Sequence, residues 1–207
     1  MSAFLGKIHF WLYNKIQLHE KLLKEILSLA EKKGFDCNLL VEESYLKFGH
    51  PIVGSLENEI DNSNIHGWLQ ERIISVEKRL AYIITKLLHQ DVINMDEISE
   101  IFYKNAVTLA EDVDIEGYSP QEIFKLIFDY MLEGMPCDRI NEVIESDDNL
   151  VKWRSSIDIH EEYWKAVDGD INNFHLLRDA WINGLLSKKD VNYVYVRNKN
   201  LSIIKRV

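Results

Sequence analysis

The sequence has few of the residues that interrupt helices. It holds three prolines and nine glycines in 207 residues, and this scarcity favours long helices over many short strands. Its two cysteines, Cys37 and Cys137, lie far apart and form no CxxC pair. That usage argues against a disulfide scaffold and is typical of a protein from a reducing compartment.

Long apolar runs and the common catalytic motifs are missing too. No stretch approaches the ~18 apolar residues that a membrane-spanning helix requires, and the first residues lack the pattern of a signal peptide. We therefore expect a cytoplasmic protein with no membrane partner. The sequence contains no GxxxxGKS/T, GxGxxG, GxSxG or HExxH motif and no Glu-x-x-His pair, so phosphate-binding loops and standard di-iron or zinc sites are not indicated.

Basic residues are outnumbered, and the formal net charge is −10. Most of such a surface repels a phosphate backbone, which makes nucleic acid a disfavoured partner. The exception is the C-terminal part, which carries Lys188, Lys189, Arg197, Lys199, Lys205 and Arg206. A charge cluster of this size is usually solvated surface.

The hydrophobic pattern predicts helices along most of the chain. A first long helix is expected at about 4–33, capped by Ser2 and ended by Gly34, and a second at about 64–89, capped by Ser63. In the first, apolar residues keep the three-and-four spacing of a buried stripe: Ile8, Leu12, Ile16, Leu22, Leu23, Ile26 and Leu29. Ser119-Pro-Gln-Glu122 forms a capping box, with Gly134 placed to end that helix. Further helices are predicted at about 38–48, 56–60, 96–111, 137–146, 149–154, 158–167 and 171–187.

The C-terminus has a different pattern. Residues 193–196 and 201–204 alternate and are β-branched, with Arg-Asn-Lys-Asn between them, which predicts a hairpin. The predicted fold is therefore mainly all-α. It is a multi-helix bundle forming a single helical domain over residues 1–190, with a small β-hairpin appendage over 191–207.

An Ile-His-x-Trp-Leu segment occurs twice, at residues 8–12 and 65–69. When residues 8–26 are aligned with residues 65–83, nine of nineteen positions are identical, including His9/His66, Trp11/Trp68 and Glu20/Glu77. Shared apolar positions are common to amphipathic helices, but shared His, Trp and Glu are not. The pattern predicts an internal duplication of the first two long helices.

Helix geometry limits what the shared His and Glu can do. Eleven residues lead from His9 to Glu20, which is about three turns, or ~16 Å, along one face. One metal ion cannot bridge them, because ligand distances are ~2 Å. In an antiparallel pair of these helices, however, His9 would face Glu77 and Glu20 would face His66. That pairing would make an interhelical site, with Trp11 and Trp68 beside it.

Two function hypotheses follow. In the first, His9, His66, Glu20 and Glu77 line an interhelical cleft that binds a divalent metal or a small anionic ligand, and any enzymatic chemistry would be metal-assisted or acid–base. In the second, the protein is a non-catalytic helical interaction or regulatory module, with the repeat as its packing seam. A homodimer is expected in either case.

Three residues are candidates for catalysis: His66, His160 and Cys137. His160 stands among the carboxylates of Asp158-Ile-His-Glu-Glu162, where it could act as a base, although polar residues at a helix start usually serve as caps. Cys137 follows a proline at the predicted start of a helix, where the dipole can lower the pKa of a thiol. The common alternative for Cys137 is a small buried side chain.

Overall fold

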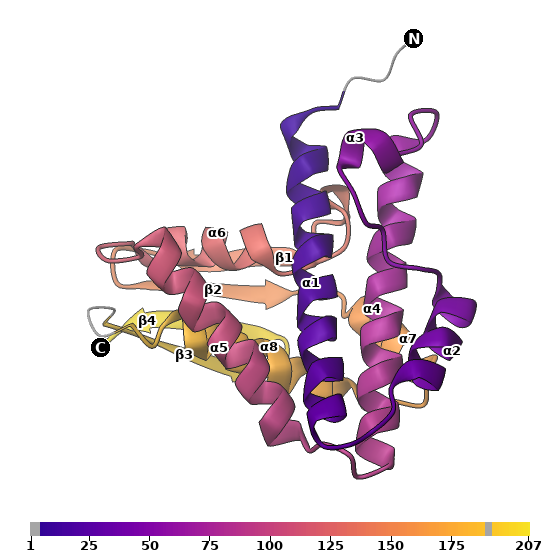
Figure 1. Cartoon of the computed structure of the whole chain (residues 1–207). Coiled ribbons are helices and arrows are strands. Elements are labelled where there is room, and N and C mark those ends of the chain that lie inside the picture. Colours follow the sequence, from indigo (N-terminus) through magenta and orange to yellow (C-terminus); the bar gives the residue numbers. More distant parts are fainter. Residues whose placement is uncertain (1–4, 189–191) are drawn as a thin grey trace.

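Two long helices form the centre of the computed structural model, which describes residues 5–188 and 192–207. Helices α1 (Lys7–Lys32) and α4 (Ile65–His89) lie side by side and run in the same direction (Figure 1). Between them, α2 (Asn38–Phe48) and α3 (Leu56–Glu59) carry the chain back to the level at which α1 begins. Among the described residues, no helix is long and apolar enough to cross a bilayer.

The two long helices match the predicted ranges, with differences at their starts. The predicted cap Ser2 and the first predicted positions of α1 lie outside the described residues. The helix closes before Gly34, which adopts the left-handed φ of +89° expected of a glycine there. The α4 cap is Asn64 and not Ser63, since the Asn64 side chain accepts a hydrogen bond from the Gly67 amide at 3.1 Å.

Four more helices follow: α5 (Met95–Val113), α6 (Pro120–Tyr130), α7 (His160–Lys165) and α8 (Ile171–Leu185). The capping box of α6 is confirmed, because the Ser119 amide donates to the Glu122 carboxylate at 2.8 Å and the Glu122 amide donates to Ser119 Oγ at 3.3 Å. The helix ends at Tyr130, before Gly134, which we expected to close it.

The helices predicted at 137–146 and 149–154 are wrong. A short 3₁₀ turn (Pro136–Asp138) leads instead into strands β1 (Asn141–Ser146) and β2 (Leu150–Ser155). A tight turn joins the strands, in which Asp147 Oδ1 accepts from the amides of Asn149 and Leu150 at 2.7 and 3.0 Å. In β2 buried residues alternate with less buried ones, at Val151 and Trp153. Period-two burial is the property of a strand with one face on a core.

The C-terminal hairpin is confirmed, but it is not an appendage. Strands β3 (Tyr193–Asn198) and β4 (Leu201–Arg206) are joined by the two-residue turn Lys199-Asn200, in which Lys199 has a φ of +55°. Strand β4 also pairs with β2, which gives one antiparallel sheet of order β1-β2-β4-β3. The predicted boundary between the helical domain and the hairpin falls on residues 189–191, outside the described residues.

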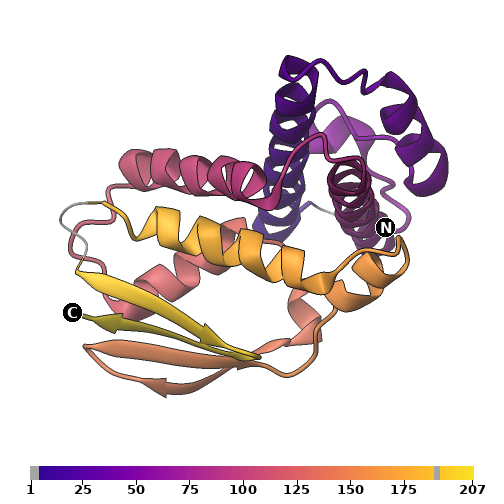
Figure 2. The ribbon, with the colours of Figure 1, turned by 90° about the horizontal axis from the view of Figure 1, so that it is seen from below.

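The sheet has helices on one face. Figure 2 shows α8 lying over the strands, with α5 stacked on the far side of α8, and contacts also join α6 to β2 and β4. Three tryptophans are fully buried in the core: Trp153 of β2, Trp164 of α7 and Trp181 of α8. The protein is thus mainly helical with a small C-terminal antiparallel sheet.

The shared apolar residues of the two long helices pack together. Leu12 and Leu69, and Ile16 and Ile73, belong to one buried cluster between α1, α3 and α4. Ile8, which we placed on the buried stripe, is 45% exposed. An internal duplication remains a prediction.

Candidate functional site

The repeated histidines meet each other and not the repeated glutamates. Because α1 and α4 are parallel, His9 lies beside His66, with ring centroids 5.5 Å apart. The antiparallel pairing of His9 with Glu77 is therefore wrong. Burial, and then the charge of His66, lowers the pKa of His9. His9 Nδ1 also accepts a hydrogen bond from the Gly6 amide at 3.0 Å, so one atom of this pair serves to cap α1.

Glu20 is held by a residue that the repeat does not share. The guanidinium of Arg79 makes two hydrogen bonds to the Glu20 carboxylate, one at 2.9 Å from Nη1 to Oε2 and a shorter one from Nη2 to Oε1. Both side chains are buried. A buried, bidentate ion pair of this kind satisfies both charges, and both carboxylate oxygens are occupied, so Glu20 is not available to bind a ligand.

The repeated tryptophans are half-buried packing residues. Trp11 Nε1 donates to Asp129 Oδ1 at 3.0 Å, and the Lys15 ammonium lies 4.1 Å from a Trp11 ring centroid. Trp68 lies beside the Tyr13 ring, with centroids 6.4 Å apart. These contacts fix helix positions, and they do not bring the two tryptophans to one site.

Glu77 pairs with a different candidate, His160 of α7. His160 Nδ1 lies 2.8 Å from Glu77 Oε2, and both side chains are about 95% buried. The imidazole stacks on the Phe174 ring of α8 with centroids 3.9 Å apart. On the other side of the ring, His160 Nε2 lies 3.8 Å from Glu133 Oε1 and has no hydrogen-bond partner among the described residues. Glu133 itself forms an ion pair with Arg178 of α8.

The His160 ring forms part of the wall of a cavity of about 290 Å³. This cavity, called here the α8–sheet cavity, lies between α8, the segment before α7 and the ends of β2, β3 and β4. Three aromatic side chains and a set of polar ones line it, among them Trp153, Phe174, Tyr195, Glu133, Asp158, His160, His175, Arg178, Arg197 and Lys199. Of the residues proposed from the sequence as site candidates, only His160 is on this wall.

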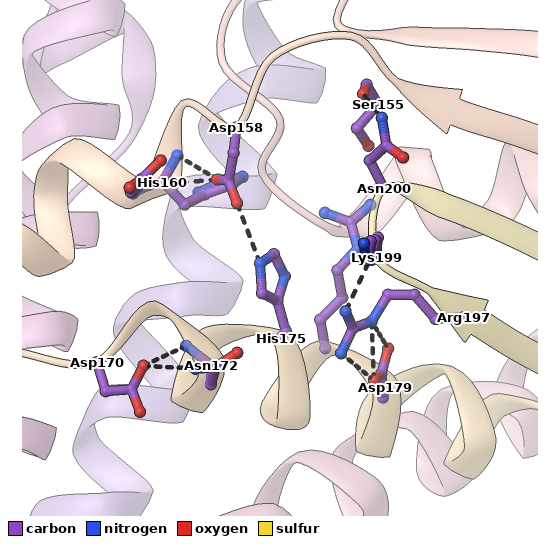
Figure 3. A network of polar contacts seen from close by, with 12 residues as sticks. Ser155, Asp158, His160, Asp170, Asn172, His175, Asp179, Arg197, Lys199 and Asn200 are labelled. Atoms are coloured by element: carbon purple, nitrogen blue, oxygen red, sulfur yellow. Dashed lines mark hydrogen bonds and ion pairs between the residues drawn. The ribbon is translucent and has the colours of Figure 1, made fainter.

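The fold explains how distant residues reach the cavity. The tight β3–β4 turn brings Lys199 and Asn200 to the end of β2, where the Ser155 amide donates to the Asn200 carbonyl at 2.9 Å. On α8, His175 and Arg178 are three residues apart and therefore share a face. Figure 3 shows His175 reaching from α8 toward Asp158, with Arg197 and Lys199 beside it from the hairpin.

Several of the charged groups in the cavity are held by partners. Arg197 Nε and Nη2 both donate to the Asp179 carboxylate, at 2.7–2.9 Å, and this contact raises the pKa of Arg197. Burial, and then the charge of Asp179, raises the pKa of Tyr195 to about 12, which keeps that hydroxyl protonated. Burial lowers the pKa of Arg178.

Asp158 connects the two cavity histidines. Its Oδ2 lies 3.0 Å from His175 Nε2, and its Oδ1 accepts from the His160 amide at 3.0 Å, as a cap of α7. Burial alone would raise the pKa of Asp158, but the His175 hydrogen bond and the nearby histidine charges outweigh it and lower this pKa.

The remaining candidates lie elsewhere. Cys137 is exposed, and it lies in the 3₁₀ turn and not at the start of a helix, so the predicted helix dipole does not act on its thiol. The four predicted metal ligands are divided among the His9–His66 pair, the Arg79-bound Glu20 and the His160-bound Glu77. In residues 5–188 and 192–207, no group of three or more His, Cys, Asp or Glu side chains is placed to hold a metal ion.

The cationic half of the cavity was missed by sequence reasoning. The signal for Arg178 was its spacing from His175 on an amphipathic helix. The signal for Arg197 and Lys199 was a basic hairpin turn in an acidic chain. Neither signal says that the two segments meet, because this depends on the pairing of β4 with β2.

Comparisons with protein-family models, with curated proteins and with solved structures gave no match. Function must therefore be inferred from the chemistry of the cavity.

Proposed function

We propose that the protein binds a small anionic ligand in the α8–sheet cavity. The observation that carries the proposal is the convergence of Arg178, Arg197 and Lys199 on one cavity of about 290 Å³ in a chain of net charge −10. Two carboxylates, Glu133 and Asp158, share the wall. Asp179 holds Arg197 from outside the lining, so three carboxylates balance the three cations. An anion entering the cavity would meet the Lys199 ammonium and the donors of Arg197 that Asp179 does not use, which is what favours this ligand class.

The side chains are suited to a planar or tetrahedral oxyanion. A guanidinium presents donors in a rigid fork that matches carboxylate and phosphate oxygens. Asp179 restrains Arg197 through Nε and Nη2, so its remaining donors are oriented before a ligand arrives. Trp153, Phe174 and Tyr195 supply an apolar floor. A few converging polar groups over apolar walls, in a space of ~300 Å³, are typical of small-molecule sites.

The geometry supports an anion better than a divalent metal. Of the four candidate ligands, Glu20 is held by Arg79 and Glu77 by His160, and each pair is buried. A metal at the His9–His66 pair would have two nitrogen ligands, whereas protein zinc sites use at least three side chains. The arrangement therefore favours the anionic alternative of the two ligand classes.

Thermal unfolding and calorimetry with a panel of small anions test the proposal. Sulfate, phosphate, citrate and a sugar phosphate are the probes, and the variants are Arg197→Gln and its matched control Arg154→Gln. Arg154 lies on the same sheet, is half-exposed and pairs with Glu142 at 2.8 Å, outside the cavity lining. Comparing two arginines separates binding from the general stabilisation that sulfate and phosphate give to most proteins.

We expect at least one probe to bind the wild type and Arg154→Gln equally, and Arg197→Gln about tenfold or more weakly, as for loss of a charge-assisted hydrogen bond of ~1.5–3 kcal/mol. Equal responses of all three proteins to every probe would overturn the proposal. That outcome would leave the helical interaction module, with the repeat as its packing seam, as the better account.

A further inference from the structure

Two residues of the α8–sheet cavity, Arg178 and His160, share the carboxylate of Glu133. This carboxylate is ion-paired with Arg178, while its Oε1 lies 3.8 Å from His160 Nε2. This gap is about 1 Å longer than a hydrogen bond between a nitrogen and a carboxylate. His160 Nε2 and Glu77 Oε1 are both buried and without a hydrogen-bond partner among the described residues. Buried polar atoms without partners are rare and call for an explanation.

The Nε2 atom is consistent with a neutral imidazole. Nδ1 faces the Glu77 carboxylate at 2.8 Å, and a carboxylate can only accept, so Nδ1 carries the hydrogen. If Nε2 also carried one, that buried N–H would have no acceptor within hydrogen-bond distance. Leaving a buried donor unpaired is unfavourable, because the donor loses its hydrogen bonds to water and gains none in the protein. The arrangement with Glu133 on Arg178 therefore favours a bare Nε2.

An anion arriving at Arg178 changes this balance. It competes with the Glu133 carboxylate for the same guanidinium, and the displaced carboxylate needs another partner. Its Oε2 keeps the hydrogen bond from Asn141 Nδ2 at 2.9 Å. The freed Oε1 can turn to His160 Nε2, which a shift of about 1 Å brings within hydrogen-bond distance, provided that Nε2 then carries a hydrogen. Without that proton, Glu77, Glu133 and the ligand would place three negative charges around Arg178. Burying unpaired charge is strongly unfavourable.

We propose that the α8–sheet cavity binds its anion together with one proton, which His160 holds between Glu77 and Glu133. This inference rests on the proposed function, and it narrows the ligand class to oxyanions able to replace a carboxylate on Arg178. The protein is then a proton-coupled anion binder, whose affinity falls as the pH rises.

Other titratable and charged groups on the neighbouring elements interact with His160 or with the carboxylates around it, Glu77, Glu133 and Asp158. They are His19 and Lys15 on α1, Glu77 on α4, Glu133 after α6, Asp158 and Tyr163 around the start of α7, and His175 and Arg178 on α8. Burial lowers the pKa of His19, and His175 already has Asp158 as its partner. His160 alone lies between two carboxylates. Lys15 is the main competitor, because burial lowers its pKa to about 7.

Calorimetry with sulfate at pH 8 tests the inference, in buffers of different ionisation enthalpy. Sulfate does not titrate at this pH, so any proton exchanged comes from the protein. The expected result is uptake of about one proton per sulfate, and an affinity for sulfate that falls about tenfold per pH unit as the pH rises, which is the slope that uptake of one proton requires. In Glu133→Gln, which removes the competing carboxylate, sulfate should bind at least as tightly and without proton uptake.

His160→Gln should bind sulfate without proton uptake, whereas the control variant Lys15→Met should keep the uptake. Binding to the wild type without proton uptake, or uptake that survives His160→Gln, overturns the inference and leaves the proposed function intact. Uptake that is lost in Lys15→Met overturns it in favour of Lys15. If no probe of the anion panel binds in an Arg197-dependent way, the proposed function fails and this inference fails with it.

Discussion

Glu20 and Glu77 hold equivalent positions in two similar helices, yet their surroundings differ. Glu20 is bound through two hydrogen bonds by Arg79, which faces it from α4 and whose Nε also lies 3.5 Å from Ser75 Oγ. Glu77 binds His160, whose second nitrogen has no hydrogen-bond partner within the described part of the chain and whose ring lines the α8–sheet cavity. We infer that the Glu20–Arg79 ion pair serves to stabilise the fold. The Glu77–His160 pair, by contrast, orients the imidazole and leaves its Nε2 atom available to bind a proton.

The largest expected effect on stability comes from breaking the buried Glu20–Arg79 ion pair. Arg79→Met leaves the Glu20 carboxylate buried without a partner, and we expect the free energy of unfolding to fall by about 3–5 kcal/mol. Urea unfolding at pH 7 measures this. The double variant Glu20→Gln with Arg79→Met should regain much of the loss. A single variant within 1 kcal/mol of the wild type would show that the pair is not desolvated.

Lys15, on α1, is a buried amine to which no carboxylate among the described residues is bound as Glu20 is bound to Arg79, and its burial should make the free energy of unfolding depend on pH. Burial is the largest cause that lowers its pKa, to about 7 from 10.5, so above pH 7 the unfolded chain binds a proton that the folded protein lacks. The cost of burying this amine is therefore greatest below pH 7 and decreases as the pH rises toward 10.5. We expect the wild type to gain about 2 kcal/mol relative to Lys15→Met between pH 7 and 9. Parallel pH profiles in urea unfolding would contradict this.

Glu77→Gln should cost less than Arg79→Met, because the glutamine carbonyl still accepts from His160 Nδ1. We expect the free energy of unfolding to fall by about 1–2 kcal/mol, the difference between a charged and a neutral hydrogen bond. The same urea experiment measures it, with the exposed Glu142→Gln as the control. A loss as large as that in Arg79→Met would mean that the two carboxylates serve the same purpose.

The smallest effect concerns the His9–His66 pair. Burial and the His66 charge lower the pKa of His9, so His66→Asn should move this pKa upward, toward its ordinary value. An NMR titration of the His9 ring resonances measures the change. An unchanged titration would assign the whole shift to burial.

Sequence reasoning located the long helices because their apolar spacing and caps are local properties. It failed at β1 and β2, where short segments such as Asn141–Ser146 have too few residues for a period to be distinguished, and where the decisive pairing with β4 is distant in sequence. It also identified Glu77 and His160 separately. Their meeting depends on how α7 docks on α4, and no spacing within either helix determines that.

The relative direction of α1 and α4 determines which residues of the repeat come into contact. The shared His and Glu gave no information on whether α1 and α4 are parallel, because either direction buries the same apolar stripe. The intervening α2 and α3 return the chain to the level at which α1 begins, and this connection makes the pair parallel. The predicted His–Glu contacts across the repeat could not form for that reason.

The central claim is that the Glu77–His160 pair borders a ligand site and that the other polar positions of the repeat do not. The most direct measurement is an NMR titration of the histidine ring resonances with the probe anion that binds most tightly in the panel above. His160 and His175 should shift with one common saturation curve, while His9 and His66 stay unchanged, and Arg197→Gln should weaken the response. Shifts confined to His9 and His66, or equal for all four rings, would contradict the claim.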